Sequence, residues 1–135
     1  MARLCVVLAV LVCLSAITQA SQLLGGWEPL DVDSAGVKQA MESALSQYNK
    51  QSNDMFQYRA VKVNKAKKQV VSGIKYILDV DVGRTNCRKP ATNANACQLH
   101  TDPTLAKIST CTFEVFVKPW MGISKLINHS CASST

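Results

Sequence analysis

Cysteine and histidine are the residues of this chain best suited to chemistry. Cys97 lies three positions before His100, a spacing that resembles a thiol nucleophile with its base. The pair is a poor candidate, because Cys97 belongs to an even set of cysteines in a chain that is expected in an oxidising compartment. We therefore expect no catalytic residue and no enzyme activity.

Metal binding and disulfide formation are the other uses of these cysteines. A zinc site is disfavoured, because the sequence has no Cys-x-x-Cys pair to combine with His100 or His129. No metal and no other cofactor is expected, and disulfides are the default for an even set. The chain has six cysteines, of which Cys5 and Cys13 lie within the N-terminal 20 residues that are expected to be removed as a secretion signal. The remaining four allow three pairings; sequential closure gives short loops, and spacing alone does not decide between the pairings. The four are Cys87, Cys97, Cys111 and Cys131.

Two apolar segments lie where polar turns would be expected. Gln69-Val70-Val71-Ser72-Gly73 separates two strand-like runs, and Pro119-Trp120 places the second of two tryptophans beside a strand-breaking proline. In one interpretation the valines fold inward and the tryptophan covers the core. In the other, large apolar groups on turns are kept exposed because a partner covers them. Two such turns together favour a shared binding edge.

The N-terminal residues 1–20 have the features of a secretion signal. Arg3 supplies the charge, residues 4–14 are apolar, and Thr18-Gln19-Ala20 is a small-residue cleavage site. The mature chain is expected to run from about Ser21 to Thr135 as one secreted domain. It has no later apolar stretch of about 18 residues, so we expect no membrane association. Without Arg3 it carries 14 basic and 9 acidic side chains, a net charge of +5.

Basic residues concentrate between positions 59 and 68. The segment lacks the interleaved aromatic residues that stack on bases, so nucleic acid is not an expected partner. Lysines on an edge strand also discourage aggregation, which explains them without a ligand. These residues are Arg59, Lys62, Lys65, Lys67 and Lys68.

The elements that position these segments follow from periodicity. Apolar residues at helical spacing predict one amphipathic helix over about 34–51, after an acidic and hydroxyl start at Asp31, Asp33 and Ser34. Its apolar stripe needs a flat apolar surface to pack on. The stripe consists of Val37, Ala40, Met41, Ala44, Leu45 and Tyr48.

Alternating runs predict that surface as an antiparallel sheet. Strands are expected at 74–82, 111–117 and about 123–131, with a less regular strand at 58–67. Residues 85–103, rich in Asn, Thr, Pro and Ala, are expected to form a loop or irregular appendage. The fold class is therefore α+β, with one long helix on an antiparallel sheet.

The chain resembles the family-two, secreted cystatins over essentially the whole mature length. Their Gln-x-Val-x-Gly pattern is met by Gln69, Val71 and Gly73, their Pro-Trp pair by Pro119-Trp120, and their N-terminal glycine by Gly25. The cysteine layout also matches, and in that family Cys87 would pair with Cys97 and Cys111 with Cys131. Trp27 departs from the pattern, because the family usually has a smaller residue there.

The resemblance implies a cystatin-like fold, a curved sheet holding a long helix, and tight reversible inhibition of papain-like cysteine proteases. The N-terminal segment and two hairpin loops would form a wedge that blocks the active-site cleft. Leu23 and Leu24 would fill substrate-side pockets, and Gly25 would let the backbone turn away from the catalytic cysteine. Val70-Val71-Ser72-Gly73 and Trp120 would cover the opposite side.

Two asparagines suggest further sites. Ser52-Asn53-Asp54 resembles the segment that some cystatins offer to legumain-type, asparagine-specific proteases, although Asn and Asp also commonly end helices and form turns. Asn128-His129-Ser130 is an acceptor sequence for N-linked sugar, close to Cys131 and to a strand end.

Two other functions fit the sequence less well. A non-inhibitory cystatin-like module, such as a cathelicidin prosegment, would leave the protease-contact motifs unexplained, and the last residues carry no basic extension. A cationic host-defence role is disfavoured because the polar face of the helix carries only Lys38 and Lys50 against Glu42. A monomer is expected, with a strand-exchanged dimer as an alternative state if Val70 and Val71 strain the turn between their strands.

Overall fold

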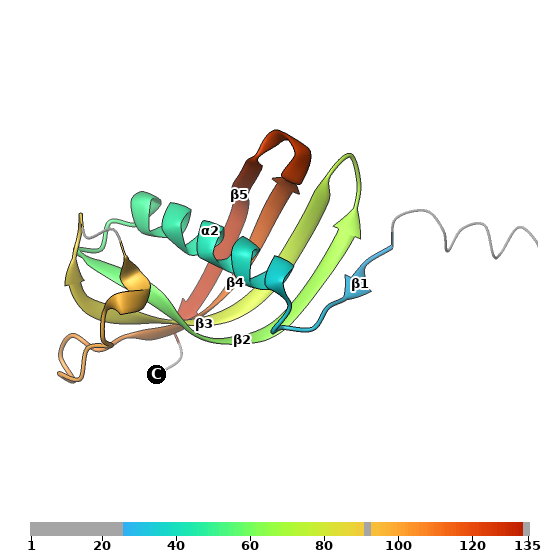
Figure 1. The fold of residues 1–135 in the computed structure, drawn as a ribbon. Helices are drawn as coiled ribbons and strands as arrows, with labels where there is room; N and C mark the ends of the chain where they lie inside the picture. The colour runs from blue at the N-terminus through green and yellow to red at the C-terminus, as the bar shows by residue number, and fades with distance from the viewer. Residues whose placement is uncertain (1–25, 91–92, 134–135) are drawn as a thin grey trace, which may run out of the picture.

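The fold is one helix lying across a curved, five-stranded antiparallel sheet (Figure 1). The structure is a computed structural model that describes residues 26–90 and 93–133. The strands are β1 (Glu28–Pro29), β2 (Phe56–Val70), β3 (Ile74–Arg88), β4 (Ile108–Lys118) and β5 (Ile123–Ser133), and the helix is α2 (Ala35–Gln51). Short 3-10 helices are η2 (Ala94–Ala96) and η3 (Pro119–Met121). The expected α+β class is confirmed.

Helix α2 begins and ends within a residue of its expected bounds. Ser34 is the N-cap residue, but its side chain makes no capping hydrogen bond; its backbone N–H donates to the carbonyl of Asp31 instead. At the other end, the N–H of Ser52 donates to the carbonyl of Tyr48. The apolar stripe packs on the sheet, whereas the opposite residues, including Glu42 and Lys50, are exposed.

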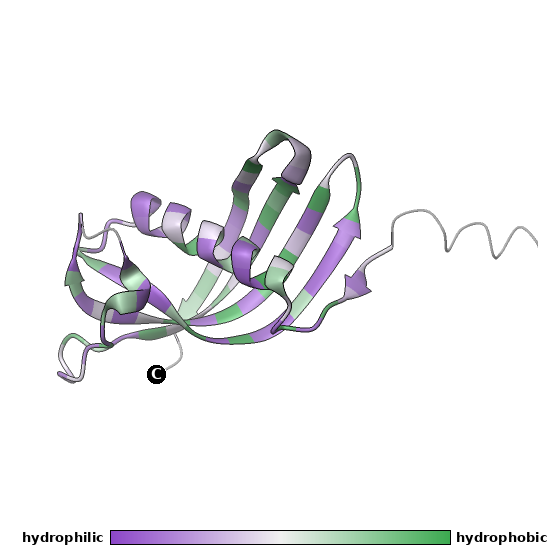
Figure 2. Cartoon of the chain, viewed as in Figure 1, coloured by the Kyte–Doolittle hydropathy of each residue, from purple (hydrophilic) through white to green (hydrophobic). Residues whose placement is uncertain are grey.

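The sheet order β1-β2-β3-β4-β5 follows the order of the strands along the chain. Every neighbouring pair is antiparallel, and the alternation of side chains places one face of each strand against α2. Figure 2 shows this alternation as bands of hydrophobic and hydrophilic colour along the strands. The fully buried side chains of the sheet include Leu78, Val80, Val82, Phe113 and Val115.

Strand β2 is longer and less regular than an ideal strand. Its register with β3 shifts at three places, between Phe56 and Tyr58, Ala60 and Lys62, and Val63 and Lys65. Such irregularities bend a strand and increase its twist, which curls the sheet around the helix. They also break strict alternation, so sequence patterning detected only the centre of this strand.

The expected loop over residues 85–103 is wrong at its start. Strand β3 continues to Arg88, because β2 begins early enough to pair Phe56 with Arg88. Thr85 is fully buried, and its hydroxyl donates to the carbonyl of Gln57, with an O···O distance of 2.7 Å. In the sequence, a polar residue at this position suggests a loop. In the structure, the hydroxyl of Thr85 is hydrogen-bonded inside the sheet.

Amide side chains connect the helix to the strands. Asn49 is buried, its Nδ2 donates to the carbonyl of Tyr58 and its Oδ1 accepts from the N–H of Tyr58. Gln47 does the same for β5, accepting from the N–H of Leu126 at 2.8 Å and donating to the carbonyl of Ser124 at 3.1 Å. Within the described part of the chain, no helix is long and apolar enough to cross a membrane.

Candidate functional site

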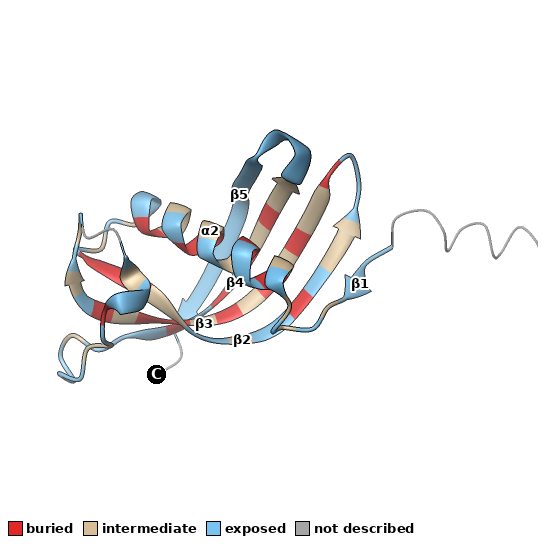
Figure 3. Cartoon of the chain, in the orientation of Figure 1, coloured by how far each residue is buried: buried red, intermediate tan, exposed pale blue. Residues whose placement is uncertain are grey.

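Two hairpin turns lie side by side at one end of the sheet. Ile74, the first residue of β3, pairs with Val117 near the end of β4, and Lys118 pairs with Ile123 across the second turn. Strand β1 reaches the same end, because Glu28 pairs with Lys68, two residues before β2 ends. Residues distant in the sequence therefore meet along one edge, coloured exposed at both turns in Figure 3.

The first turn is narrow and presents its side chains to solvent. The N–H of Val71 donates to the carbonyl of Gly73 at 2.9 Å, which leaves Ser72 at the tip. Val70 and Val71 are 60% and 48% exposed, so they do not fold inward. Among the described residues only Gly122 has a positive φ. Val70 and Val71 are therefore not strained by a left-handed backbone conformation.

Gly73 is buried where the first turn meets β4. A Cβ placed on it would lie 2.7 Å from the carbonyl oxygen of Val117 and 2.9 Å from Cζ of Phe116. Glycine is therefore required for the close approach of the two hairpins. The first residue of the same motif, Gln69, is half-buried and lies beside Lys75 across the β2–β3 pair.

The second turn exposes the largest apolar surface of this edge. Pro119–Met121 form a 3-10 turn that ends at Gly122, where φ is +65°. Trp120 is 68% and Met121 59% exposed. Met121 was not found from the sequence, although its position next to Trp120 was a signal for it.

The N-terminal part of the predicted site lies mostly outside the described residues. This applies to Leu23, Leu24 and Gly25. Trp27, which is described, is exposed beside β2, and Nζ of Lys67 lies 5.2 Å from its ring centroid. Such a cation–π contact holds the ring against the strand.

We name this surface the apolar edge: Trp27 together with the turns at residues 69–74 and 119–124. Neither turn contains a charged residue, although the chain has an excess of basic residues. Figure 2 shows β2 changing from hydrophilic to hydrophobic just before its hairpin. The edge offers burial and shape to a partner, and neither turn has a His, Asp, Glu or Lys side chain that could act as a general base.

Cys97, which resembles a catalytic nucleophile in the sequence, does not lie at the apolar edge and is not a free thiol. Cys87 is bonded to Cys97, and Cys111 to Cys131, the pairing that the resemblance implied. The ring of His100 packs edge-on against Phe56, with centroids 4.5 Å apart. Among residues 26–90 and 93–133 no three His, Cys, Asp or Glu side chains gather as a metal site.

Comparison with known proteins identifies the family of the chain. The family model for the cystatin domain matches residues 25–120 of the chain. This protein belongs to the cystatin family. It is 46% identical over 110 residues to cystatin-C of Bos taurus, an alignment that covers 82% of this chain and 74% of that protein. It is 43% identical over 135 residues to the cystatin of Gallus gallus, covering 96% and 97% of the two chains.

Solved structures agree with the sequence relatives. Dimeric human cystatin F superposes with a TM-score of 0.77 at 29% identity, covering 83% of this chain and 90% of that one. The likeness to cystatin-C supports the family-two type. Cystatins inhibit cysteine proteases and are not enzymes, so the role of this cystatin is inhibition and its partners are cysteine proteases.

A second candidate site of this cystatin lies where α2 leads into β2, at the end of the sheet away from the apolar edge (Figure 1). Asn53 is exposed, whereas both of its neighbours are anchored. Ser52 Oγ accepts from the N–H of Asp54 at 3.1 Å, and Nζ of Lys89 donates to the Ser52 carbonyl at 2.7 Å. The segment Ser52-Asn53-Asp54 therefore holds a single free side chain between two fixed residues.

The Asp54 carboxylate is the centre of a charged cluster. It accepts from Arg84 Nη2 at 2.6 Å and from the Tyr58 hydroxyl at 2.8 Å, and its other oxygen accepts from the N–H of Phe56. Burial favours the neutral carboxyl, but these hydrogen bonds and the Arg84 charge outweigh burial and lower the pKa of Asp54. Burial and the bond to Asp54 raise the pKa of Tyr58 to about 12.

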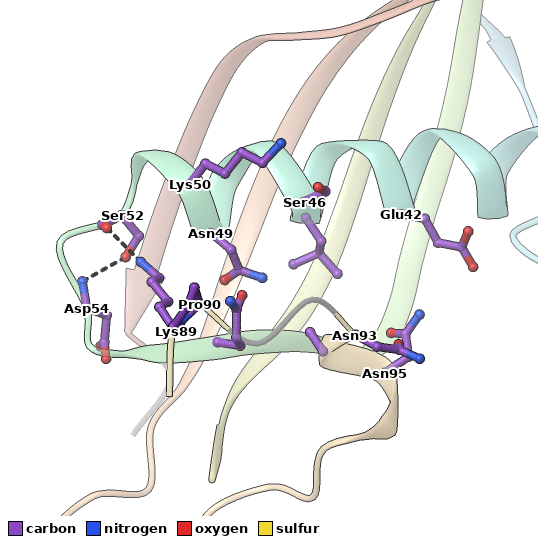
Figure 4. Close-up of a pocket in the computed structure, with 13 residues that line it drawn as sticks. Glu42, Ser46, Asn49, Lys50, Ser52, Asp54, Lys89, Pro90, Asn93 and Asn95 are labelled. Atoms are coloured by element: carbon purple, nitrogen blue, oxygen red, sulfur yellow. Dashed lines mark hydrogen bonds between the residues drawn. The ribbon is translucent and has the colours of Figure 1, made fainter. Parts of the chain in front are cut away.

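A cavity of about 650 Å³ opens beside this segment (Figure 4). It lies between α2 and two described segments, Lys89-Pro90 and residues 93–95. Its labelled side chains are mostly polar, and Lys89 reaches across it to Ser52. The charged cluster was not foreseen from the sequence, because its members lie on a loop and two strands that only the fold brings together.

Asn128, the candidate sugar acceptor, is exposed on β5. It pairs with Glu114 of β4, immediately beyond the bulge at Ile127.

Proposed function

We propose that this cystatin is a secreted, tight-binding, reversible inhibitor of papain-like cysteine proteases that blocks the active-site cleft with its apolar edge. The observation that carries the proposal is the pair of adjacent turns, uncharged and exposed, at one end of the sheet. Leu23, Leu24 and Gly25 would fill the substrate-side pockets, next to where β1 reaches this end. Val70-Val71-Ser72-Gly73 and Pro119-Trp120 would fill the other side, with Gln69 supporting the first turn.

Inhibition of this kind needs no chemistry from the inhibitor. A standard interface of about 1,600 Å² is sufficient for tight binding when the contacting edge is formed beforehand. The short hydrogen bond across the first turn and the contact of Gly73 with β4 provide that preorganisation. Because no scissile bond is offered at either turn, the inhibitor is expected to dissociate intact.

Titration of papain with three variants tests the proposal. Trp120→Ala and deletion through Gly25 are each expected to weaken inhibition by about 1 kcal/mol or more. Met55→Ala is the control, because Met55 is 59% exposed on the opposite part of the molecule. Equal inhibition constants for the wild type and for both edge variants would refute the proposal.

Asn53 supports a second candidate function, inhibition of legumain-type proteases. We infer that its free amide enters the specificity pocket of an asparagine-specific enzyme, since Ser52 and Asp54 hold the segment in place. The adjacent cavity provides room for side chains of that partner. Asn53→Lys is expected to abolish legumain inhibition and to leave papain inhibition unchanged; unchanged legumain inhibition would remove Asn53 from the site.

The inhibitor is proposed to act as an extracellular monomer after removal of residues 1–20. Exchange of strands at the first hairpin would require the turn at Val71–Gly73 to open, and this would remove that turn from the apolar edge. A dimer formed in this way is therefore expected to lose papain inhibition. Size separation before and after partial unfolding, with papain titration of each fraction, tests this expectation.

A further inference from the structure

Strand β5 forms one outer edge of the sheet. Its only strand neighbour in the described part of the molecule is β4. On the other side of this 11-residue strand, Gln47 of α2 bonds to the Ser124 carbonyl and the Leu126 N–H, and beyond Leu126 the outward backbone groups have no described partner. Its residues are exposed except Leu126. An edge of this kind is a template for pairing with another chain unless something protects it.

The opposite edge of the sheet is protected in two ways. Strand β1 covers the part of β2 near Lys67 and Lys68, and exposed lysines at 62 and 65 follow along the strand. Lysines discourage edge-to-edge pairing because like charges would be brought together. Strand β5 has no proline and only one charged residue, Lys125, so charge does not protect it.

The single bulge of β5 provides partial protection. Leu126 pairs with Val115 and Asn128 with Glu114, which leaves Ile127 as the extra residue, 44% exposed. A bulge disturbs the backbone ladder only locally. The segment beyond it, from Asn128 to Ser133, continues as regular pairing with β4.

Asn128 lies at the start of that unprotected segment. Its neighbour His129 faces the helix, since the rings of His129 and Tyr48 are 5.3 Å apart. Alternation along the strand therefore directs Asn128 to the opposite, outer face. Among the described residues the Asn128 side chain has no hydrogen-bond partner, and the residue is exposed.

Asn128 also begins the only Asn-x-Ser/Thr sequence of the chain, Asn128-His129-Ser130. We propose that Asn128 carries an N-linked glycan that shields the β5 edge from pairing with a second copy of this chain. Transfer forms a bond from the Asn128 amide nitrogen to the anomeric carbon of an oligosaccharide. The bond from that carbon to the phosphate of a lipid-linked diphosphate donor breaks, and the amide loses one proton.

The position of Asn128 leaves inhibition intact. It lies five positions from Ile123 at the start of β5, which corresponds to roughly 16 Å along the strand. A glycan there is directed away from α2 and lies beside the backbone edge rather than at the apolar edge. Two copies paired through their β5 strands would also keep both turns of the apolar edge. They would differ in this from strand-exchanged dimers, in which the first turn is lost.

The test uses the full chain, with residues 1–20, secreted from a eukaryotic cell line. Wild type and Ser130→Thr, which preserves the acceptor sequence, are expected to lose carbohydrate mass on treatment with peptide N-glycosidase. Asn128→Gln is expected to show no such loss. Asn53→Gln is the matched control, because Asn53 is also exposed but does not begin an acceptor sequence.

Sedimentation of the same proteins tests the shielding role. Asn128→Gln is expected to dimerise at concentrations where the glycosylated wild type stays monomeric, and adding Ile127→Lys is expected to restore the monomer. Papain inhibition should be equal in all of them, which shows that each variant is folded.

Two results would overturn the proposal. One is a wild-type protein that either fails to enter the medium or enters it without carbohydrate on Asn128. The other is an Asn128→Gln protein that stays monomeric over the whole concentration range of the glycosylated form.

Discussion

At the scale of single residues, the apolar edge depends on positions that have no room for a side chain. Gly73 is buried against the backbone of Val117, and a Cβ there would lie within 2.7 Å of the carbonyl oxygen. The obstructing atom belongs to a paired strand, so it cannot move aside as a flexible side chain would. Contact between the two turns therefore depends on this glycine.

We predict that Gly73→Ala separates the two hairpins. The cost in folding stability is expected to be about 1–3 kcal/mol, typical of overpacking a tight site. Displacement of the first turn should also weaken papain inhibition. Thermal unfolding and inhibition constants measure the two effects, and Gly26→Ala, which has open space around it, should leave stability unchanged.

Two methionines form a matched pair for testing how far the apolar edge extends. Met121 and Met55 are each 59% exposed, but only Met121 lies on a turn of the edge. Met121→Ala is predicted to weaken papain inhibition by about 1 kcal/mol, whereas Met55→Ala should have no effect. Equal inhibition by the two variants would limit the edge to the motif residues.

At the scale of elements, α2 both fills the concave face of the sheet and completes the hydrogen bonds of β5. Gln47 bonds to Ser124 and Leu126 just before the Ile127 bulge, where β5 departs from regular pairing with β4. Together with Ser43, whose hydroxyl accepts from the Ser124 hydroxyl at 2.8 Å, Gln47 thus fixes the strand that leads out of the second turn.

Replacing Gln47 tests this connection. Gln47→Ala removes the acceptor for the Leu126 N–H, and an unsatisfied group of this kind costs about 1–3 kcal/mol. We expect faster hydrogen exchange at the Leu126 amide, lower stability and weaker inhibition through the second turn. Gln39→Ala is the control, because Gln39 is exposed on the outer side of the same helix.

The elements that were predicted well are those whose pattern is regular. The apolar stripe of α2 and the alternation from Ile74 to Val82 gave the helix and the centre of β3. The ends of β2 and β3 were missed, because three register shifts and the buried Thr85 break the pattern. The turns of the site were found because valines and tryptophan are unusual there, whereas the Asp54 cluster joins residues 30 positions apart and had no local signal.

At the scale of the whole molecule, the cluster of Asp54, Arg84 and Tyr58 makes the free energy of unfolding depend on pH. The folded pKa of Asp54 is below the value of about 3.9 expected in the unfolded chain. Its contribution to the free energy of unfolding is therefore complete above that value and is lost as the pH falls through the folded pKa.

Denaturant unfolding at several pH values measures this contribution. Asp54→Asn should be less stable than wild type at pH 7, and the difference should shrink once the pH falls below about 4. Lys75 and Glu114, a more exposed ion pair 2.9 Å apart, provide the comparison. Glu114→Gln should change stability by about 0–1 kcal/mol at neutral pH. A constant difference between wild type and Asp54→Asn across this range would contradict the assignment.

The two candidate binding sites lie at opposite ends of the curved sheet (Figure 1). Strand β2 starts near the Asn53 segment and ends at the first turn, 15 residues later, a span of roughly 50 Å if fully extended. We predict that the inhibitor saturated with papain still inhibits a legumain-type enzyme. Mutual exclusion of the two enzymes in a competition assay would contradict two separate sites.

Each of the two disulfides joins residues that are close in the sequence, and this determines which parts of the molecule reduction would release. Cys87 and Cys97 are 10 positions apart, Cys111 and Cys131 are 20 apart, and neither bond joins α2 to the sheet. Cleavage of both bonds would free the appendage after β3 and the far end of the last hairpin. The helix would remain in place, because buried side chains and the hydrogen bonds of Ser43, Gln47 and Asn49 attach it to the strands.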